Sequence, residues 1–503
     1  MRNPNELYAL AFTAYRSGEL IRANALLDQC LIQAPDMASA YLLKSVTHES
    51  QDTPVRLALV EQAVALDPTD PEGWYNLGVF HGERDERDQA LAAYRRAVLL
   101  DPYFADALKN GCELLRRSGE FDTALEWADR QLQTPSDAWP GHLNRAVCLL
   151  HMRRFDEAEA AFAEAKRLAP DRPIIDWERF ALMLFQRRFA EAWDDFEHRF
   201  ACGHLNGVFC YPFAQPLWRG EALAGRHILI HNEQGLGDQL MFASALHDVV
   251  AAAGRVTLIA APELVSLFTA SFPTVRVLPA LYGAFAGDHP EPPWLNALGP
   301  VDFQAPIGSV MAVLRRTPES FSTTPYLRPS DAARRAWAGF DPGPGLKVGL
   351  CWASNPAVFR ADSAQRAVRK SMRLEAMAAL ASVSGASLVS VLNWSLDPAP
   401  AAFEGQLLDV SNRLRSLDDT AALIERLDLV ITVDTAVAHL AGAMGKETWL
   451  LLHDFADCRW GLEGDRSYWY RAMALIRQSS AGDWAGVIET VVERLHDRVG
   501  ADR

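Results

Sequence analysis

A proline recurs at a nearly constant interval over the first 170 residues. Pro35, Pro68, Pro102, Pro135 and Pro170 are separated by 33, 34, 33 and 35 residues. Each closes a segment whose apolar residues recur at helical spacing, and proline ends a helix because it lacks the backbone N–H and clashes with the preceding turn. A period of this length predicts an array of helical repeats, in which each unit buries its apolar face against its neighbours.

The clearest unit runs from Trp74 to Pro102 and resembles the tetratricopeptide repeat, a pair of helices. Small residues such as Gly78 and Ala90 let the two helices approach, and aromatic residues such as Tyr94 fill the space between them. Matching residues are Leu77 and Ala97 in this unit, Gly18 and Ala23 in the first, Gly119, Phe121 and Ala124 in the fourth, and Phe155, Ala158 and Phe162 in the fifth. With a last unit at 174–200, we predict about six units, or twelve helices, in a curved solenoid over residues 1–200.

Three asparagines recur at intervals of 34 in successive units. Asn76, Asn110 and Asn144 each fall on the first helix of a unit. A row of side-chain amides can donate to and accept from a peptide backbone whatever its sequence, which predicts that the solenoid binds an acceptor polypeptide. The alternative is that each asparagine only hydrogen-bonds within its own repeat.

Charge and cysteine content exclude several protein classes. The net charge is −15, and residues 1–200 carry 23 basic and 33 acidic side chains, so a nucleic-acid binder that relies on overall basic charge is excluded. The seven cysteines form no CxxC pair, which argues against a disulfide framework or a zinc site. With no run of about 18 apolar residues and no cleavable leader, we expect a cytoplasmic protein without an integral membrane segment.

After residue 200 the pattern changes to short apolar strands that alternate with helices, which predicts parallel α/β structure. A Pro/Gly-rich and basic passage at 328–345 is interpreted as a linker between two Rossmann-like domains, at 201–340 and 341–503. Because ligands of such sheets bind at the carboxyl ends of the strands, we expect the turns that follow the strands to face a shared cleft. The predicted strands are 228–231, 256–261, 275–279, 347–352, 387–392, 407–410, 428–433 and 448–452.

The first candidate constellation is Gly235-Leu236-Gly237-Asp238, between a predicted strand and a helix. The glycines permit a tight turn and close backbone approach, and the helix dipole favours the ionised form of Asp238. An ionised carboxylate at this place could act as a general base toward an acceptor hydroxyl. The alternative role of Asp238 is a simple helix cap. A full GxGxxG pattern with a later acidic residue is absent, so a dinucleotide-dependent oxidoreductase is weakly supported.

The second constellation is a local excess of basic side chains in an acidic chain. Arg369-Lys370-Ser371 lies just before a predicted helix, where two cations and a hydroxyl could meet a phosphate. The alternative is a solvated loop with scattered charges. The other members of this basic run are Arg360, Arg366 and Arg373, against the single acidic residue Asp362.

The third constellation follows the predicted strand at 428–433. Asp434, Thr435 and Ala436 begin a helix that also carries His439. The free amides of the first helical turn, with the Thr435 hydroxyl and the His439 ring, predict an anion site, and Asp434 would cap the helix or meet a sugar hydroxyl. The alternative for His439 is a packed helix residue.

These motifs together resemble the heptosyltransferase-like glycosyltransferases of the GT-B fold, and in particular bacterial proteins that join tetratricopeptide repeats to such a domain. The matching segments are 233–238, 349–356, 369–371 and 433–445. The resemblance implies transfer of a sugar from a nucleotide sugar, without a bound metal or other cofactor. By position it makes Asp238 the base, Lys370 and Ser371 diphosphate contacts, and Thr435, Ala436 and His439 the phosphate site, although Ala436 stands where such enzymes commonly have glycine.

The repeats suggest a polypeptide acceptor, and the whole chain is also similar to repeat-containing enzymes that glycosylate cytoplasmic proteins, including flagellins before export. The resulting hypothesis is O-glycosylation of Ser or Thr in a protein held by the solenoid. Two alternatives remain open. One is a glycosyltransferase that acts on lipopolysaccharide or another saccharide, and the other is a non-catalytic scaffold with a degenerate transferase fold.

Overall fold

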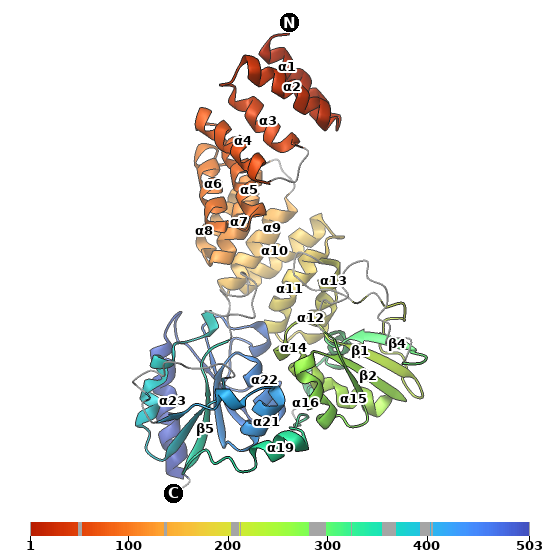
Figure 1. Ribbon diagram of the computed structural model, residues 1–503, viewed down its shortest axis with the longest axis vertical. Helices are drawn as coiled ribbons and strands as arrows, with labels where there is room; N and C mark the ends of the chain where they lie inside the picture. The colour runs from red at the N-terminus through yellow and green to blue at the C-terminus, as the bar shows by residue number, and fades with distance from the viewer. Residues whose placement is uncertain are drawn as a thin grey trace. The chain divides into compact units, whose positions relative to one another are not determined.

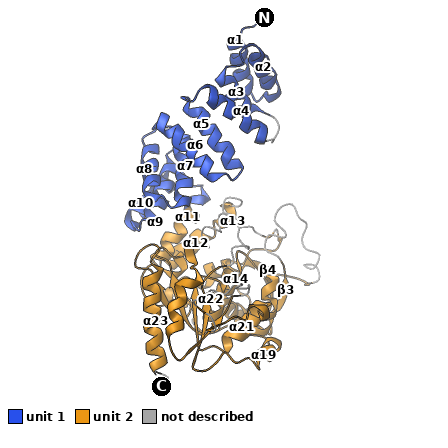
Figure 2. Ribbon diagram, turned by 60° about the vertical axis from the view of Figure 1, so that its left-hand side comes forward, with its two compact units in different colours: residues 1–175 blue, residues 176–503 orange. Residues whose placement is uncertain are grey.

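A computed structural model describes residues 2–48, 53–134, 138–202, 211, 213–280, 298–322, 324–354, 369–392, 403 and 406–501. The chain divides into two compact units, residues 1–175 and 176–503 (Figure 2). Pro135, Arg360, Asp362 and Arg366 lie outside the described residues.

Unit 1 consists of helices that follow one another as antiparallel pairs (Figure 1). The prolines at 35, 68, 102 and 170 each lie in the short connection after the second helix of a pair, as their chemistry predicts. The helices are α1 (Pro4–Arg16), α2 (Leu20–Gln33), α3 (Ala38–Thr47), α4 (Thr53–Leu66), α5 (Pro71–Glu83), α6 (Arg87–Leu100), α7 (Ala105–Ser118), α8 (Phe121–Gln131), α9 (Trp139–His151) and α10 (Phe155–Leu168).

Small residues set the spacing of the helices in this unit. A Cβ atom on Gly78 of α5 would lie 2.5 Å from Tyr94 Cε1 of α6, and one on Gly111 of α7 would lie 2.3 Å from Trp127 Cζ3 of α8. Ala90 and Ala97 are fully buried. The helix-pair pattern predicted from small and aromatic residues is therefore the packing that the structure shows.

The last predicted repeat at 174–200 forms a helix pair, but most of it belongs to unit 2. Its helices are α11 (Pro173–Phe185) and α12 (Phe189–Phe196), followed by the short α13 (Arg199–Cys202). The Trp193 indole donates to the Arg315 carbonyl at 2.8 Å, and the Phe196 ring lies 6.0 Å from that of Phe242. The division falls at residue 175 rather than 200 because these large aromatic side chains are buried against the α/β part of the chain.

The rest of unit 2 holds two sheets whose strands all pair in parallel. The first has the order β3-β2-β1-β4 and the second β10-β9-β8-β5-β6-β7. The strands are β1 (His227–His231), β2 (Arg255–Ala260), β3 (Arg276–Pro279), β4 (Phe303–Pro306), β5 (Leu346–Cys351), β6 (Ala386–Ser390), β7 (Leu407–Leu408), β8 (Leu429–Val433), β9 (Glu447–Leu452) and β10 (Met473–Arg477). Their helices are α14 (Leu236–Phe242), α15 (Leu246–Ala252), α16 (Val265–Ser271), α18 (Ser309–Leu314), α19 (Asp331–Trp337), α21 (Leu417–Glu425), α22 (Ala436–Ala443) and α23 (Trp484–Ala501).

The eight predicted strands are present, together with two strands that were not predicted, β4 and β10. The helix α19 was not predicted either, and it lies inside the passage interpreted as a linker. This helix forms because Ala333 and Trp337 are buried, and the Arg334 guanidinium pairs with Glu425 of α21 at 2.7 Å. The parallel α/β character is confirmed, and the finer GT-B arrangement stays a prediction.

A buried ion pair joins α13 to the turn that follows β1. The Arg199 side chain is fully buried, and its Nε and Nη2 donate to Glu233 at 2.8 and 2.9 Å. The Gly308 amide also donates to Glu233 Oε1 at 2.6 Å, and Arg199 Nη2 donates to the Ser309 hydroxyl at 2.8 Å. Breaking a buried pair leaves a charge without compensation, so this contact holds the turn firmly to the helical segment before it.

We predict that Glu233→Gln lowers the free energy of unfolding by about 3–5 kcal/mol, because Arg199 would lose its buried counter-charge and keep only the partly exposed Glu197. Asp194→Asn is the matched control. Asp194 pairs with Arg316 in the same unit, but its side chain is 64% exposed, so the loss should stay below about 1 kcal/mol. Chemical denaturation of the full chain measures both, and equal losses would contradict the assignment.

Candidate functional site

The predicted glycine turn follows β1, all five residues of which are buried. Gln234 has a left-handed backbone with φ 57°, an uncommon conformation for a residue with a side chain, and one that is found at functional turns. Gly235 caps α14, and its amide donates to Asp238 Oδ2 at 3.0 Å. Asp238 therefore lies in the first turn of a helix, where the helix dipole stabilises its charge.

A matching turn follows β8 in the second sheet. Thr435 caps α22, and its hydroxyl accepts from the Val437 amide at 3.2 Å. Asp434 precedes it and has a side chain that is 14% exposed. The helix begins at Ala436, so its first amides lie at the end of the strand, where an anion can be bound.

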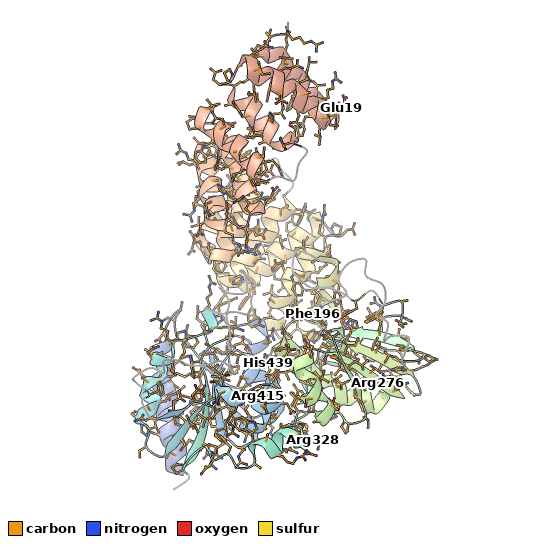
Figure 3. The ribbon with its side chains drawn as sticks, viewed as in Figure 1. Glu19, Phe196, Arg276, Arg328, Arg415 and His439 are labelled. Atoms are coloured by element: carbon orange, nitrogen blue, oxygen red, sulfur yellow. The ribbon has the colours of Figure 1, made fainter. Side chains whose placement is uncertain are left out.

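The starts of these two helices are in contact. A Cβ on Gly237 of α14 would lie 3.0 Å from His439 Cδ2 and 3.7 Å from Ala436 Cα of α22. Figure 3 shows His439 at the place where α22, which follows β8 of the second sheet, meets α14, which follows β1 of the first sheet. The residue without a side chain at 237 permits this approach, which brings Asp238 and Asp434 to the same region.

His439 is buried and neutral at this contact. Its side chain is 3% exposed, its Nδ1 lies 2.9 Å from the Tyr470 hydroxyl, and its ring stacks on Trp460 with centroids 5.1 Å apart. Burial, reinforced by the charge of Arg459, lowers the pKa of His439 to about 4. These contacts favour the alternative of a packed helix residue, and the predicted donor contact would come from an uncharged ring.

Arg459 is a site residue that the sequence analysis did not single out. It lies in a short turn at Cys458–Trp460 and donates through Nη1 to Asp238 Oδ1 at 2.6 Å. Its Nε also donates to Asp457 Oδ1 at 2.8 Å. Although burial raises the pKa of Asp457, Arg459 lowers it more, to well below its usual value. The sequence does carry a signal for Arg459: segment 453–460 directly follows β9, so it lies at the carboxyl end of a strand, where ligands of such sheets bind.

The predicted basic residues lie beside this group. The Ser371 hydroxyl accepts from the Ser354 amide at 3.0 Å, next to the end of β5. The Lys370 charge adds to the effect of burial and of Arg459 in lowering the pKa of His439. Arg369 likewise adds to the burial that lowers the pKa of His453, the residue after β9. The structure thus brings the three predicted constellations together, while their roles stay predictions.

The asparagine row lies in unit 1 and hydrogen-bonds locally. Asn76 donates to the Glu72 carbonyl at 2.9 Å, and buried Asn144 accepts from Arg116 at 2.8 Å. Asn110 hydrogen-bonds the Tyr94 hydroxyl, which limits the rise that burial causes in the pKa of Tyr94, to about 12. These contacts favour the alternative of a role within the repeats, and acceptor binding by the row stays a prediction.

Over the described residues, no group of three or more His, Cys, Asp or Glu side chains could hold a metal ion. The site combines carboxylates, cations and the start of helix α22. Asp238 keeps 18% of its side chain exposed, so a small substrate can reach it. Such an arrangement can bind a phosphate at the start of α22 and can accept a proton at Asp238.

We predict that Gly237→Ala lowers the free energy of unfolding by about 1–3 kcal/mol, because the added methyl group pushes α14 away from His439. Gly339→Ala is the control in the same unit, since a Cβ there would meet no atom within 4 Å. Denaturation of the two variants measures the difference, and a neutral Gly237→Ala would refute the close contact.

The lowered pKa of His439 predicts a pH dependence of stability. Between about pH 4 and the ordinary histidine value near 6.5, the unfolded chain binds a proton that the folded chain does not, so stability is lost as the pH falls through this window. His439 should contribute up to about 1.4 kcal/mol per pH unit. His439→Phe keeps a ring against Trp460 and does not titrate, so unfolding measured from pH 7 to 4.5 should show a smaller slope. An unchanged slope would show that His439 is protonated in the folded protein.

Models of known protein families match segments in both parts of the chain. Residues 401–451 match the model of glycosyltransferase family 9 (heptosyltransferase), and residues 71–104 and 140–172 match a tetratricopeptide repeat model. The first of these segments includes β8, Asp434, Thr435 and α22.

Among curated relatives, protein FlbA of Caulobacter vibrioides is 28% identical over 449 residues, which cover 86% of this chain and 73% of that protein. The human protein O-mannosyl-transferase TMTC3 is 28% identical over 158 residues, which cover 30% of this chain and 17% of that protein. A solved structure of pilF from Pseudomonas aeruginosa is 16% identical, with a TM-score of 0.35, and the match covers 40% of this chain and 94% of that one.

No helix in the described part of the chain is long and apolar enough to cross a membrane. Helix pairs with the spacing of the prolines fill unit 1, and the site of unit 2 lies in and beside the family 9 segment. The chain combines segments that match a tetratricopeptide repeat model with a segment that matches the glycosyltransferase family 9 (heptosyltransferase) model.

Proposed function

We propose that this chain is a glycosyltransferase of the GT-B fold that moves a sugar from a nucleotide sugar to Ser or Thr of a protein, and that its repeats recruit this protein acceptor. The contact between Asp238 and the start of α22 carries the proposal. It places a carboxylate and the cations Lys370 and Arg459 beside the start of α22, and α22 lies in the segment that matches a glycosyltransferase family.

In the proposed reaction, the acceptor oxygen forms a bond to the anomeric carbon, and its proton passes to Asp238. The bond between the anomeric carbon and the phosphate oxygen breaks, and the electron pair stays with the phosphate. The Ala436 amide at the start of α22 and the nearby cations stabilise the charge that develops there. No step requires a metal ion or another cofactor.

The repeats support a protein acceptor, because helical repeat arrays present extended surfaces to polypeptides. TMTC3, which is 28% identical to this chain over 158 residues, is named a protein O-mannosyl-transferase. The second candidate is a saccharide acceptor, since the matched family is described as heptosyltransferase. The intact mass of proteins expressed together with the full chain separates the two candidates. A co-expressed protein gains the mass of a sugar only if it is the acceptor. We place the reaction in the cytoplasm, and flagellin is one acceptor to test.

We predict that Asp238→Asn lowers sugar transfer by about 10²–10⁴-fold, because the general base is lost, and that it leaves binding of the nucleotide sugar intact. A thermal-shift screen of nucleotide sugars first identifies the donor, and transfer from it is then followed by mass. Asp331→Asn is the control, since the Asp331 side chain is 83% exposed in the same unit. Undiminished transfer in Asp238→Asn would remove this residue from the reaction.

A further inference from the structure

Arg459 links the ends of two strands that belong to different sheets. Its Nη1 donates to Asp238, which follows β1 of the first sheet. Its Nε, Nη2 and backbone amide donate to Asp457, at 2.8, 3.3 and 3.1 Å, and Asp457 follows β9 of the second sheet. The Arg459 guanidinium is therefore hydrogen-bonded both to Asp457, its near neighbour in sequence, and to Asp238, the proposed base.

Both carboxylate oxygens of Asp238 accept a hydrogen bond in this arrangement. Oδ2 accepts from the Gly235 amide, and Oδ1 accepts the charge-assisted hydrogen bond of Arg459. A base that takes a proton from an acceptor hydroxyl needs an oxygen that can meet that hydroxyl. Each oxygen keeps a second lone pair, but the bond from Arg459 Nη1 takes up one side of Oδ1, so release of this bond opens that side of Asp238 to an acceptor hydroxyl.

Several contacts that do not involve Asp238 also hold Arg459 in position. Its carbonyl accepts from the Trp469 indole at 3.0 Å, and the next carbonyl, of Trp460, accepts from Arg477 at 2.7 Å. With the bonds to Asp457, these contacts hold the backbone and the Nε side of the guanidinium. Among the hydrogen bonds of the described residues, only the one from Nη1 crosses from Arg459 to the first sheet, so Nη1 can change partner while the rest of the residue stays in place.

A phosphate is the ligand that fits such a group. Guanidinium groups bind phosphate through parallel hydrogen bonds, and a phosphate at the start of α22 would lie in the region that Arg459 shares with His439 and Lys370. We propose that the donor phosphate takes over Arg459 Nη1 and so frees Asp238 Oδ1, which makes Arg459 a donor-binding residue that couples donor binding to the release of the base. This inference rests on the proposed function and predicts that the donor binds before the acceptor.

Calorimetry on the full chain with UDP, GDP and ADP tests the coupling. Arg459→Met should weaken binding of the nucleoside diphosphate that the protein accepts by about 10-fold, the loss of a charged hydrogen bond, and Arg459→Lys should restore part of it. Asp238→Asn should bind this diphosphate at least as tightly as the unmodified chain, because the carboxylate no longer competes for Nη1. A pair with only a structural role would instead weaken binding in both variants.

Arg316→Met is the control for loss of a paired arginine, since Arg316 forms an exposed ion pair with Asp194 in the same unit. If the unmodified chain binds none of the three nucleotides, the proposed function fails together with the inference. If it binds one and Arg459→Met binds it equally well, the inference alone is wrong. Weaker binding in Asp238→Asn would also overturn the inference, because it would exclude competition for Nη1.

Discussion

The close approach of α14 and α22 is the constraint on which the site depends. Gly237 leaves room for His439, and this contact places the turn after β1 against the turn after β8. Each turn alone is an ordinary strand-to-helix connection with a capping residue. Together they set the Asp238 carboxylate beside the positive end of the α22 dipole, an arrangement that suits phosphate binding and proton transfer.

Charge at this contact is arranged by burial and pairing rather than by single residues. His439 is kept neutral, so it fills space and hydrogen-bonds Tyr470 without adding positive charge. Arg459 supplies the charge instead and is balanced by Asp457 and Asp238. The buried pair of Arg199 and Glu233 holds the first turn from the other side. The site is therefore held in place by ion pairs on both sides of the glycine turn.

Much of the fold could be predicted from local pattern. The prolines and small residues of unit 1 indicated helix pairs, because these residues act within a few turns of their own position. The strands β4 and β10 were missed, because their place in the sheets is set by pairing with β1 and β9 rather than by a local sequence pattern. That α12 belongs to the second compact unit could not be read from local pattern either, because it depends on where its aromatic rings are buried.

The sequence by itself determined the repeat period, the parallel α/β pattern and the three turns that carry Asp238, Lys370 and Thr435. These follow from residue chemistry that acts along the chain. Only the tertiary structure decided that the turns meet, that Arg459 pairs with Asp238 across 221 residues, and that His439 is buried and neutral. The reason is physical: burial and ion pairing depend on which distant segments pack together, and local periodicity does not specify such contacts.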